Sequence, residues 1–116
     1  MRVTKPLVLV LLLAYLAGCA TPVPFDKLRY VGSWQGDESY LLITEDGFVR
    51  YEQYRALLVG ELITGTEGPL RRFEGDNFIV GIAPLLTTFV VDKPPYLDGD
   101  EWKMVVRKKE LVRIAP

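Results

Sequence analysis

Residues 39–55, SYLLITEDGFVRYEQYR, carry the pattern that decides the fold. Two segments rich in apolar residues, 39–44 and 48–55, flank the tripeptide Glu-Asp-Gly. An Asp-Gly pair between such segments is a strong hairpin signal, because glycine adopts a positive φ without steric penalty. We therefore expect two antiparallel strands joined by a tight turn.

Short apolar segments separated by turn residues continue from Tyr30 to the end of the chain. No segment has a convincing 3.6-residue apolar stripe longer than two turns, so strands are favoured over helices. Residues 56–64 fit either one strand with a bulge at Gly60 or a short helix, and the flanking Gly65, Gly68 and Pro69 favour the strand. The whole pattern predicts about eight strands of about six residues, which is typical of an antiparallel meander. Because the edges of such a sheet need protection, we expect an all-β fold that closes into a small barrel.

Alternation along these strands predicts which side chains face the interior. An eight-stranded barrel is just wide enough to be filled by side chains or to hold one small ligand. The predicted inward set is bulky enough to fill that space, and it consists of Trp34, Leu41, Ile43, Val49, Tyr51, Phe78, Val80, Ile82, Phe89, Trp102 and Met104.

One short motif links the predicted barrel to a known group of proteins. The tripeptide Gly32-Ser33-Trp34 resembles the G-x-W signature of lipocalin and calycin barrels, in which a basic residue usually lies on the last strand. Arg113 matches that position. The resemblance implies a lipocalin-like barrel in which Trp34 covers one end and Arg113 stacks across it. A guanidinium over an indole contributes about 0.5 to 2 kcal/mol, so we expect Trp34 and Arg113 to form a structural, barrel-closing pair.

The beginning of the chain carries the most specific motif. Residues 7–17 are almost entirely apolar and follow Arg2 and Lys5, a layout typical of a secretory signal. This segment is shorter than the about 20 apolar residues that a membrane span requires. Its end, LAGC at residues 16–19, resembles the lipobox of bacterial lipoprotein precursors. The resemblance implies that Cys19 is lipidated and that cleavage before Cys19 removes the signal.

These observations divide the chain into three parts: a lipoprotein signal peptide (residues 1–18), the lipidated cysteine with a tether (19–28), and a single β-barrel domain (29–116). The lipid on Cys19 is expected to hold the protein on a membrane without a transmembrane helix. In enterobacterial lipoproteins an Asp after the cysteine favours the inner membrane. Ala20 stands there instead, which by resemblance favours the outer membrane of the cell envelope, facing the periplasm.

Composition excludes several classes of function. Removal of residues 1–18 leaves more acidic than basic residues, so we expect no nucleic-acid partner. The chain has no His and one Cys, which removes the commonest general base and zinc ligand and any internal disulfide. The acidic residues of 98–101 lack the spacing of a calcium loop and are typical of a turn. We therefore expect no catalytic residue, no metal and no cofactor.

The segment 92–102, DKPPYLDGDEW, is the one distinctive loop that the sequence predicts. Pro94 and Pro95 favour an extended polyproline conformation, and the adjacent Tyr96 offers an aromatic contact at low entropic cost. The loop is a candidate for docking a partner. The alternative, which we favour, is a stiff connector with Tyr96 folded against the rim of the barrel.

Two functional hypotheses follow from the sequence. The first is a non-enzymatic interaction or structural module, anchored near the membrane and bound to another envelope protein. The second is a lipocalin-like binder that holds a small hydrophobic ligand or a lipid inside the barrel. The bulky inward set favours the first.

Overall fold

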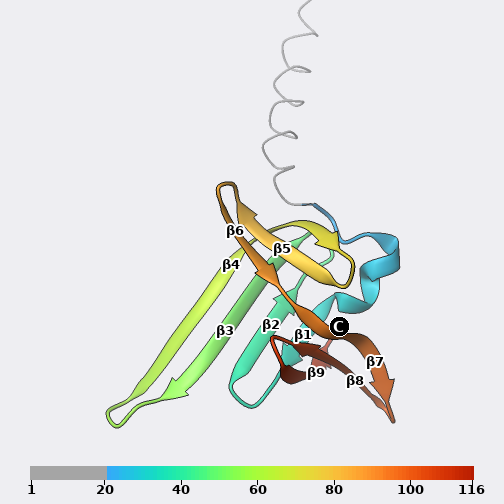
Figure 1. The fold of residues 1–116 in the computed structure, drawn as a ribbon. Coiled ribbons are helices and arrows are strands. Elements are labelled where there is room, and N and C mark those ends of the chain that lie inside the picture. The colour runs from blue at the N-terminus through green and yellow to red at the C-terminus, as the bar shows by residue number, and fades with distance from the viewer. Residues whose placement is uncertain (1–20) are drawn as a thin grey trace, which may run out of the picture.

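The computed structural model describes residues 21–116. The predicted signal peptide and Cys19 lie outside these described residues. The model contains one 3₁₀ helix and nine strands, and Figure 1 shows their arrangement. Their bounds are η1 (Phe25–Tyr30), β1 (Gly32–Gln35), β2 (Ser39–Ile43), β3 (Phe48–Ala56), β4 (Glu61–Glu74), β5 (Asn77–Ile82), β6 (Leu85–Phe89), β7 (Val91–Asp98), β8 (Glu101–Val106) and β9 (Lys109–Ala115).

All nine strands belong to one antiparallel sheet that curls into a half-barrel (Figure 1). Their order is β6-β5-β4-β3-β2-β1-β9-β8-β7, so neighbours in the sheet are neighbours in the chain except at β1 and β9. The expected all-β antiparallel meander is therefore confirmed. Within residues 21–116, β6 and β7 are the two edges of the sheet, and no strand pairing joins them.

The hairpin predicted from residues 39–55 is confirmed as β2 and β3. Ser39 faces Gln53 at one end of the ladder, and Ile43 faces Val49 at the other. Gly47 has a φ of 95° in the turn, which a residue with a side chain rarely adopts. The Asp-Gly signal identified this turn because the backbone needs that conformation.

The core lies on the concave face of the curled sheet. Four aromatic side chains, Trp34, Tyr51, Phe78 and Phe89, are at most 2% exposed, and the Phe78 and Phe89 rings stack with centroids 5.0 Å apart. All of the predicted inward set is buried except two residues. Trp102 is only partly buried, and Ile82 is 60% exposed.

The prediction for Ile82 was wrong because this residue ends β5. It faces Leu85 next to the β5–β6 turn, beyond the reach of the side chains that fill the interior. Alternation along a strand predicts one face, but that face is buried only where another element covers it.

The interpretation of residues 56–64 as one bulged strand was also wrong. The chain reverses direction there, and the Leu57 N–H donates to the Gly60 carbonyl over 3.0 Å. Gly60 has a φ of 89°, which fits a turn. The resulting β3–β4 ladder extends from Phe48 and Pro69 to Ala56 and Glu61, well past the end of β2.

The part of the predicted tether that the structure describes is hydrogen-bonded to the sheet. The Thr21 N–H donates to the Leu70 carbonyl over 2.9 Å, and the Val23 N–H donates to the Glu45 carbonyl over 3.0 Å. Val23 itself is buried with the core cluster. The chain is therefore held against the fold from Thr21 onward.

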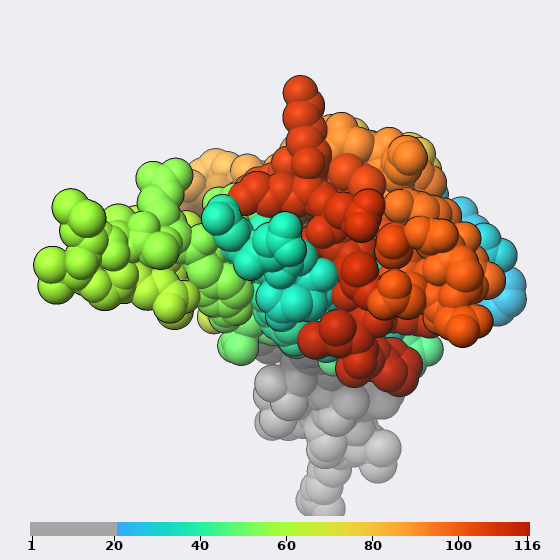
Figure 2. Space-filling view, turned by 90° about the horizontal axis from the view of Figure 1, so that it is seen from below, coloured from blue at the N-terminus to red at the C-terminus, as the bar shows by residue number. Residues whose placement is uncertain are grey.

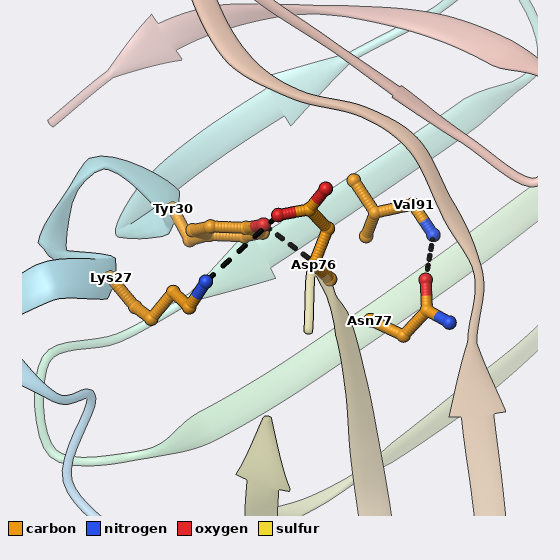
Figure 3. A network of polar contacts seen from close by, with 5 residues as sticks. All are labelled: Lys27, Tyr30, Asp76, Asn77 and Val91. Atoms are coloured by element: carbon orange, nitrogen blue, oxygen red, sulfur yellow. Dashed lines mark hydrogen bonds and ion pairs between the residues drawn. The ribbon is translucent and has the colours of Figure 1, made fainter. Parts of the chain in front are cut away.

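Polar contacts connect elements that no strand ladder joins (Figure 3). The Tyr30 hydroxyl donates to the Asp76 carbonyl over 2.9 Å, which ties η1 to the β4–β5 turn. The Val91 N–H donates to the Asn77 side-chain oxygen over 2.8 Å, which ties the start of β7 to the start of β5. These contacts hold the half-barrel closed on the side where β6 and β7 do not pair.

Candidate interaction surface

The structure places Trp34 and Arg113 together, opposite each other on β1 and β9. The Arg113 guanidinium carbon is 5.9 Å from the centroid of the Trp34 ring and 5.5 Å from that of Trp102. Arg29 lies over the same Trp102 ring at 5.7 Å. The indole N–H of Trp34 donates to the Tyr30 carbonyl over 2.9 Å, so the fully buried ring has its polar atom satisfied. This geometry suits a structural stack.

The segment with Pro94 and Pro95 is part of a strand, where a loop was predicted. It lies in β7, at the edge of the sheet, and the β7–β8 register shifts between Lys93 and Tyr96, where the two prolines stand. An edge strand tolerates proline because no carbonyl of a neighbouring strand needs the missing N–H on the outer side. Tyr96 is half-buried, with the Lys93 ammonium 5.6 Å from its ring centroid. The prolines also block strand addition at this edge.

A surface that was not predicted from the sequence lies at the end of the β3–β4 hairpin. We call residues 54–63 the arm. Figure 2 shows the arm as the green protrusion that stands out from the body of the molecule. Its exposed apolar residues, with the fraction of each that is accessible, are Leu57 (49%), Leu58 (106%), Val59 (91%), Leu62 (43%) and Ile63 (59%).

The arm has little support from the rest of the sheet. Pairing between β2 and β3 ends at Gln53, and pairing between β4 and β5 begins at Leu70, so both edges of the arm carry unpaired backbone groups. The Tyr54 N–H bonds to the Glu38 carbonyl over 2.8 Å and holds only its base. Soluble proteins rarely leave an apolar strand pair exposed without a use for it.

The sequence did contain a signal for the arm. Leu57, Leu58 and Val59 are consecutive, so they cannot all face a core from one strand. Three apolar residues immediately before Gly60 therefore indicate an apolar turn.

The acidic cluster at residues 98–101 forms a turn with an ion pair. The Asp98 carboxylate accepts a hydrogen bond from the Lys103 ammonium over 2.8 Å, and this bond lowers the pKa of Asp98. Across residues 21–116, no group of three His, Cys, Asp or Glu side chains is placed to hold a metal ion.

Two hydroxyl groups in the described interior lack a hydrogen-bond partner. Within the described chain, the Ser39 and Tyr51 hydroxyls are buried without a hydrogen-bond partner. Arg107 lies over the Tyr51 ring at 5.1 Å and over the Phe89 ring at 4.3 Å. A buried hydroxyl without a partner is unfavourable by about 1–3 kcal/mol, so the Tyr51 hydroxyl retains unused hydrogen-bonding capacity in the interior.

In the part of the chain that the structure describes, no helix is both long enough and apolar enough to span a bilayer. No protein-family model, curated protein or solved structure matches this chain.

Proposed function

We propose that this protein is a lipid-anchored lipoprotein of the bacterial cell envelope, and that its β-domain is a non-enzymatic interaction module. The LAGC sequence at residues 16–19 supports the anchor. The exposed apolar arm is the single observation that carries the interaction role. Its partner is an envelope protein with an apolar cleft.

The arm suits a binding role because folding does not use its apolar surface. Leu58 is 106% exposed and Val59 is 91% exposed, so neither contributes to the core. Apolar surface gains about 25 cal/mol per Å² when it is removed from water, which a partner can supply. A two-stranded arm is also narrow enough to enter a cleft, and its free backbone edges offer additional hydrogen bonds.

The position of the arm fits an anchored protein. The described chain begins at the opposite end of the molecule from the tip of the arm, as Figure 1 shows. A lipid attached two residues before Thr21 therefore leaves the arm directed away from its own membrane.

Native mass spectrometry of the lipidated protein, extracted from the envelope in mild detergent, tests this proposal. We expect an additional mass of protein size that is lost in the Leu58→Ser, Val59→Ser double variant. The matched control is Asp100→Ser, which changes an exposed residue at another hairpin turn. An adduct of protein size that survives the double variant would contradict the role of the arm.

The second candidate function is an internal binder of a small hydrophobic ligand, favoured by the unpartnered Tyr51 hydroxyl. The same experiment separates the two functions. An internal ligand would add a mass far below that of a protein, and Tyr51→Phe would reduce its occupancy while the arm variant would not.

A further inference from the structure

The attachment of Thr21 fixes which end of the domain lies near Cys19. The Thr21 N–H bonds to the Leu70 carbonyl, and the chain spans at most about 3.3–3.6 Å per residue. Cys19 therefore lies within about 7 Å of Thr21, whatever its conformation. Leu70 is paired with Val80 on β5, so this end of the domain also carries the end of β5.

Large apolar side chains are exposed at this same end. We call Phe25, Ile82, Leu85 and Leu86 the apical face. Phe25 is 90% exposed, Leu85 is 82% exposed and Ile82 is 60% exposed. Figure 1 shows the β5–β6 turn and the start of the described chain at the same end of the molecule, with η1 on the other side of that start from the turn.

An open groove continues the apical face toward the point of attachment. It has a volume of about 470 Å³ and runs between β4 and the β5–β6 hairpin. Pro69 lines it next to Leu70, and Ile82 and Leu85 line its other side. Apolar residues of the groove therefore extend from the neighbourhood of Leu70, where Thr21 is attached, to the tip of the β5–β6 hairpin.

Backbone pairing and a backbone hydrogen bond fix the conformation of the β5–β6 hairpin. Ile82 faces Leu85 in the ladder, and the Leu86 N–H donates to the Pro84 carbonyl over 3.1 Å. Gly81 has a φ of 125°, and a Cβ there would lie 2.2 Å from the Leu85 carbonyl oxygen. The exposed side chains of Ile82 and Leu85 are therefore presented by an ordered turn.

We propose that the apical face docks on the lipid bilayer, so that the β5–β6 tip and Phe25 insert beside the acyl chains on Cys19. This inference rests on the proposed lipidation of Cys19. The bilayer is the occupant that fits, because the anchor holds this face at the membrane surface and an anchored apolar turn gains by leaving water.

The charges at this end predict the lipid preference. Asp26 follows Phe25, and Glu45 and Asp46 form the β2–β3 turn beside Val23. Lys27 and Arg29 lie in the same η1 helix, so this end carries charges of both signs and no purely basic patch. Docking is therefore expected to be apolar and insensitive to salt.

The test places a tryptophan on each apolar tip in turn. Leu85→Trp reports on the apical face, and Leu58→Trp, at a residue that is even more exposed, is the matched control on the arm. The lipidated proteins are reconstituted in phosphatidylcholine vesicles with brominated acyl chains, which quench tryptophan on contact. The unsubstituted protein supplies the background from Trp34 and Trp102.

We expect severalfold stronger quenching for Leu85→Trp than for Leu58→Trp, unchanged by salt. Quenching of Leu85→Trp at the background level, or stronger quenching of Leu58→Trp, would overturn the docking proposal. The mass of the Cys19 peptide reports lipidation separately. If Cys19 carries no lipid, the proposed anchor fails, and attachment of the mature chain to a maleimide lipid through the Cys19 thiol still tests docking by the same two variants.

Discussion

The Asn77 side-chain oxygen accepts a hydrogen bond from the Val91 N–H over 2.8 Å, across the side of the half-barrel where β6 and β7 do not pair. A single side chain thus replaces a strand ladder at this point. Val91 is 6% exposed, so its N–H cannot turn to water instead.

Replacement of Asn77 by alanine is expected to reduce the free energy of unfolding by about 1–3 kcal/mol, because the Val91 N–H is left unsatisfied. Asn77→Asp keeps an oxygen acceptor and serves as the control, with a smaller expected loss. Urea denaturation of both variants measures the difference. Equal stability of Asn77→Ala and the unchanged protein would show that the contact does not close the sheet.

Trp34→Ala is expected to lower the stability by about 3–5 kcal/mol, because it removes a fully buried ring from the core. Arg113→Lys keeps the charge but loses the guanidinium contacts with the Trp34 and Trp102 rings, with an expected loss of about 0.5–2 kcal/mol in the free energy of unfolding. Thermal unfolding compares the variants. If Arg113→Lys were as stable as the unchanged protein, the guanidinium contacts with the two rings would contribute nothing to stability.

Tyr30 gives the fold a dependence on alkaline pH. Burial is the larger cause and the nearby Asp76 carboxylate the smaller cause of a rise in the pKa of Tyr30 from 10.0 to about 12. Because the pKa is higher in the folded state, this contribution to stability is complete below pH 10 and is lost as the pH rises toward 12. The melting temperature of the unchanged protein should therefore fall more steeply in this window than that of Tyr30→Phe. Parallel pH profiles would contradict the assignment.

Two glycines with positive φ should respond differently to alanine. At Gly81 a Cβ would lie 2.2 Å from the Leu85 carbonyl oxygen, whereas at Gly75 nothing lies within 4 Å. Gly75→Ala is expected to reduce the free energy of unfolding by about 1–2 kcal/mol, because alanine is disfavoured in the left-handed conformation at this position. Gly81→Ala adds a backbone clash, and we expect a larger loss in denaturant titrations. Similar losses for both would mean that the β5–β6 hairpin rearranges freely.

The arm should be dispensable for folding. The Leu58→Ser, Val59→Ser double variant is expected to change the stability by no more than about 0.5 kcal/mol per residue, because both side chains are in water. Leu70→Ala, at a residue that is 1% exposed, is expected to lose about 2–5 kcal/mol. A large loss for the arm variant would mean that the arm packs against the domain in solution.

Part of this structure could be predicted from local sequence signals. Asp46 and Gly47 predict the β2–β3 turn, because an Asp-Gly pair suits that backbone and little else competes. The Gly32-Ser33-Trp34 motif and Arg113 similarly predict the contact between the buried Trp34 ring and Arg113. These features depend on residues whose geometry is specified locally or by a recurrent motif.

Other features depend on which elements pack beside a segment. The sequence of that segment alone does not specify them. Pro94 and Pro95 indicate a loop in isolation, but an edge strand accommodates them. Ile82 continues an inward alternation, but no element covers it. The sequence of residues 56–64 favours one bulged strand, whereas the chain turns there and the hairpin extends past its neighbours.

Photo-crosslinking in living cells tests the central claim, the interaction role of the arm, most directly. A photoreactive amino acid replaces Leu58 in the full chain, and the same replacement at Asp100, on an exposed turn of the β7–β8 hairpin, is the control. We predict one discrete crosslinked band of an envelope protein at position 58 and none at position 100. No crosslink at position 58, or the same bands at both positions, would contradict the account.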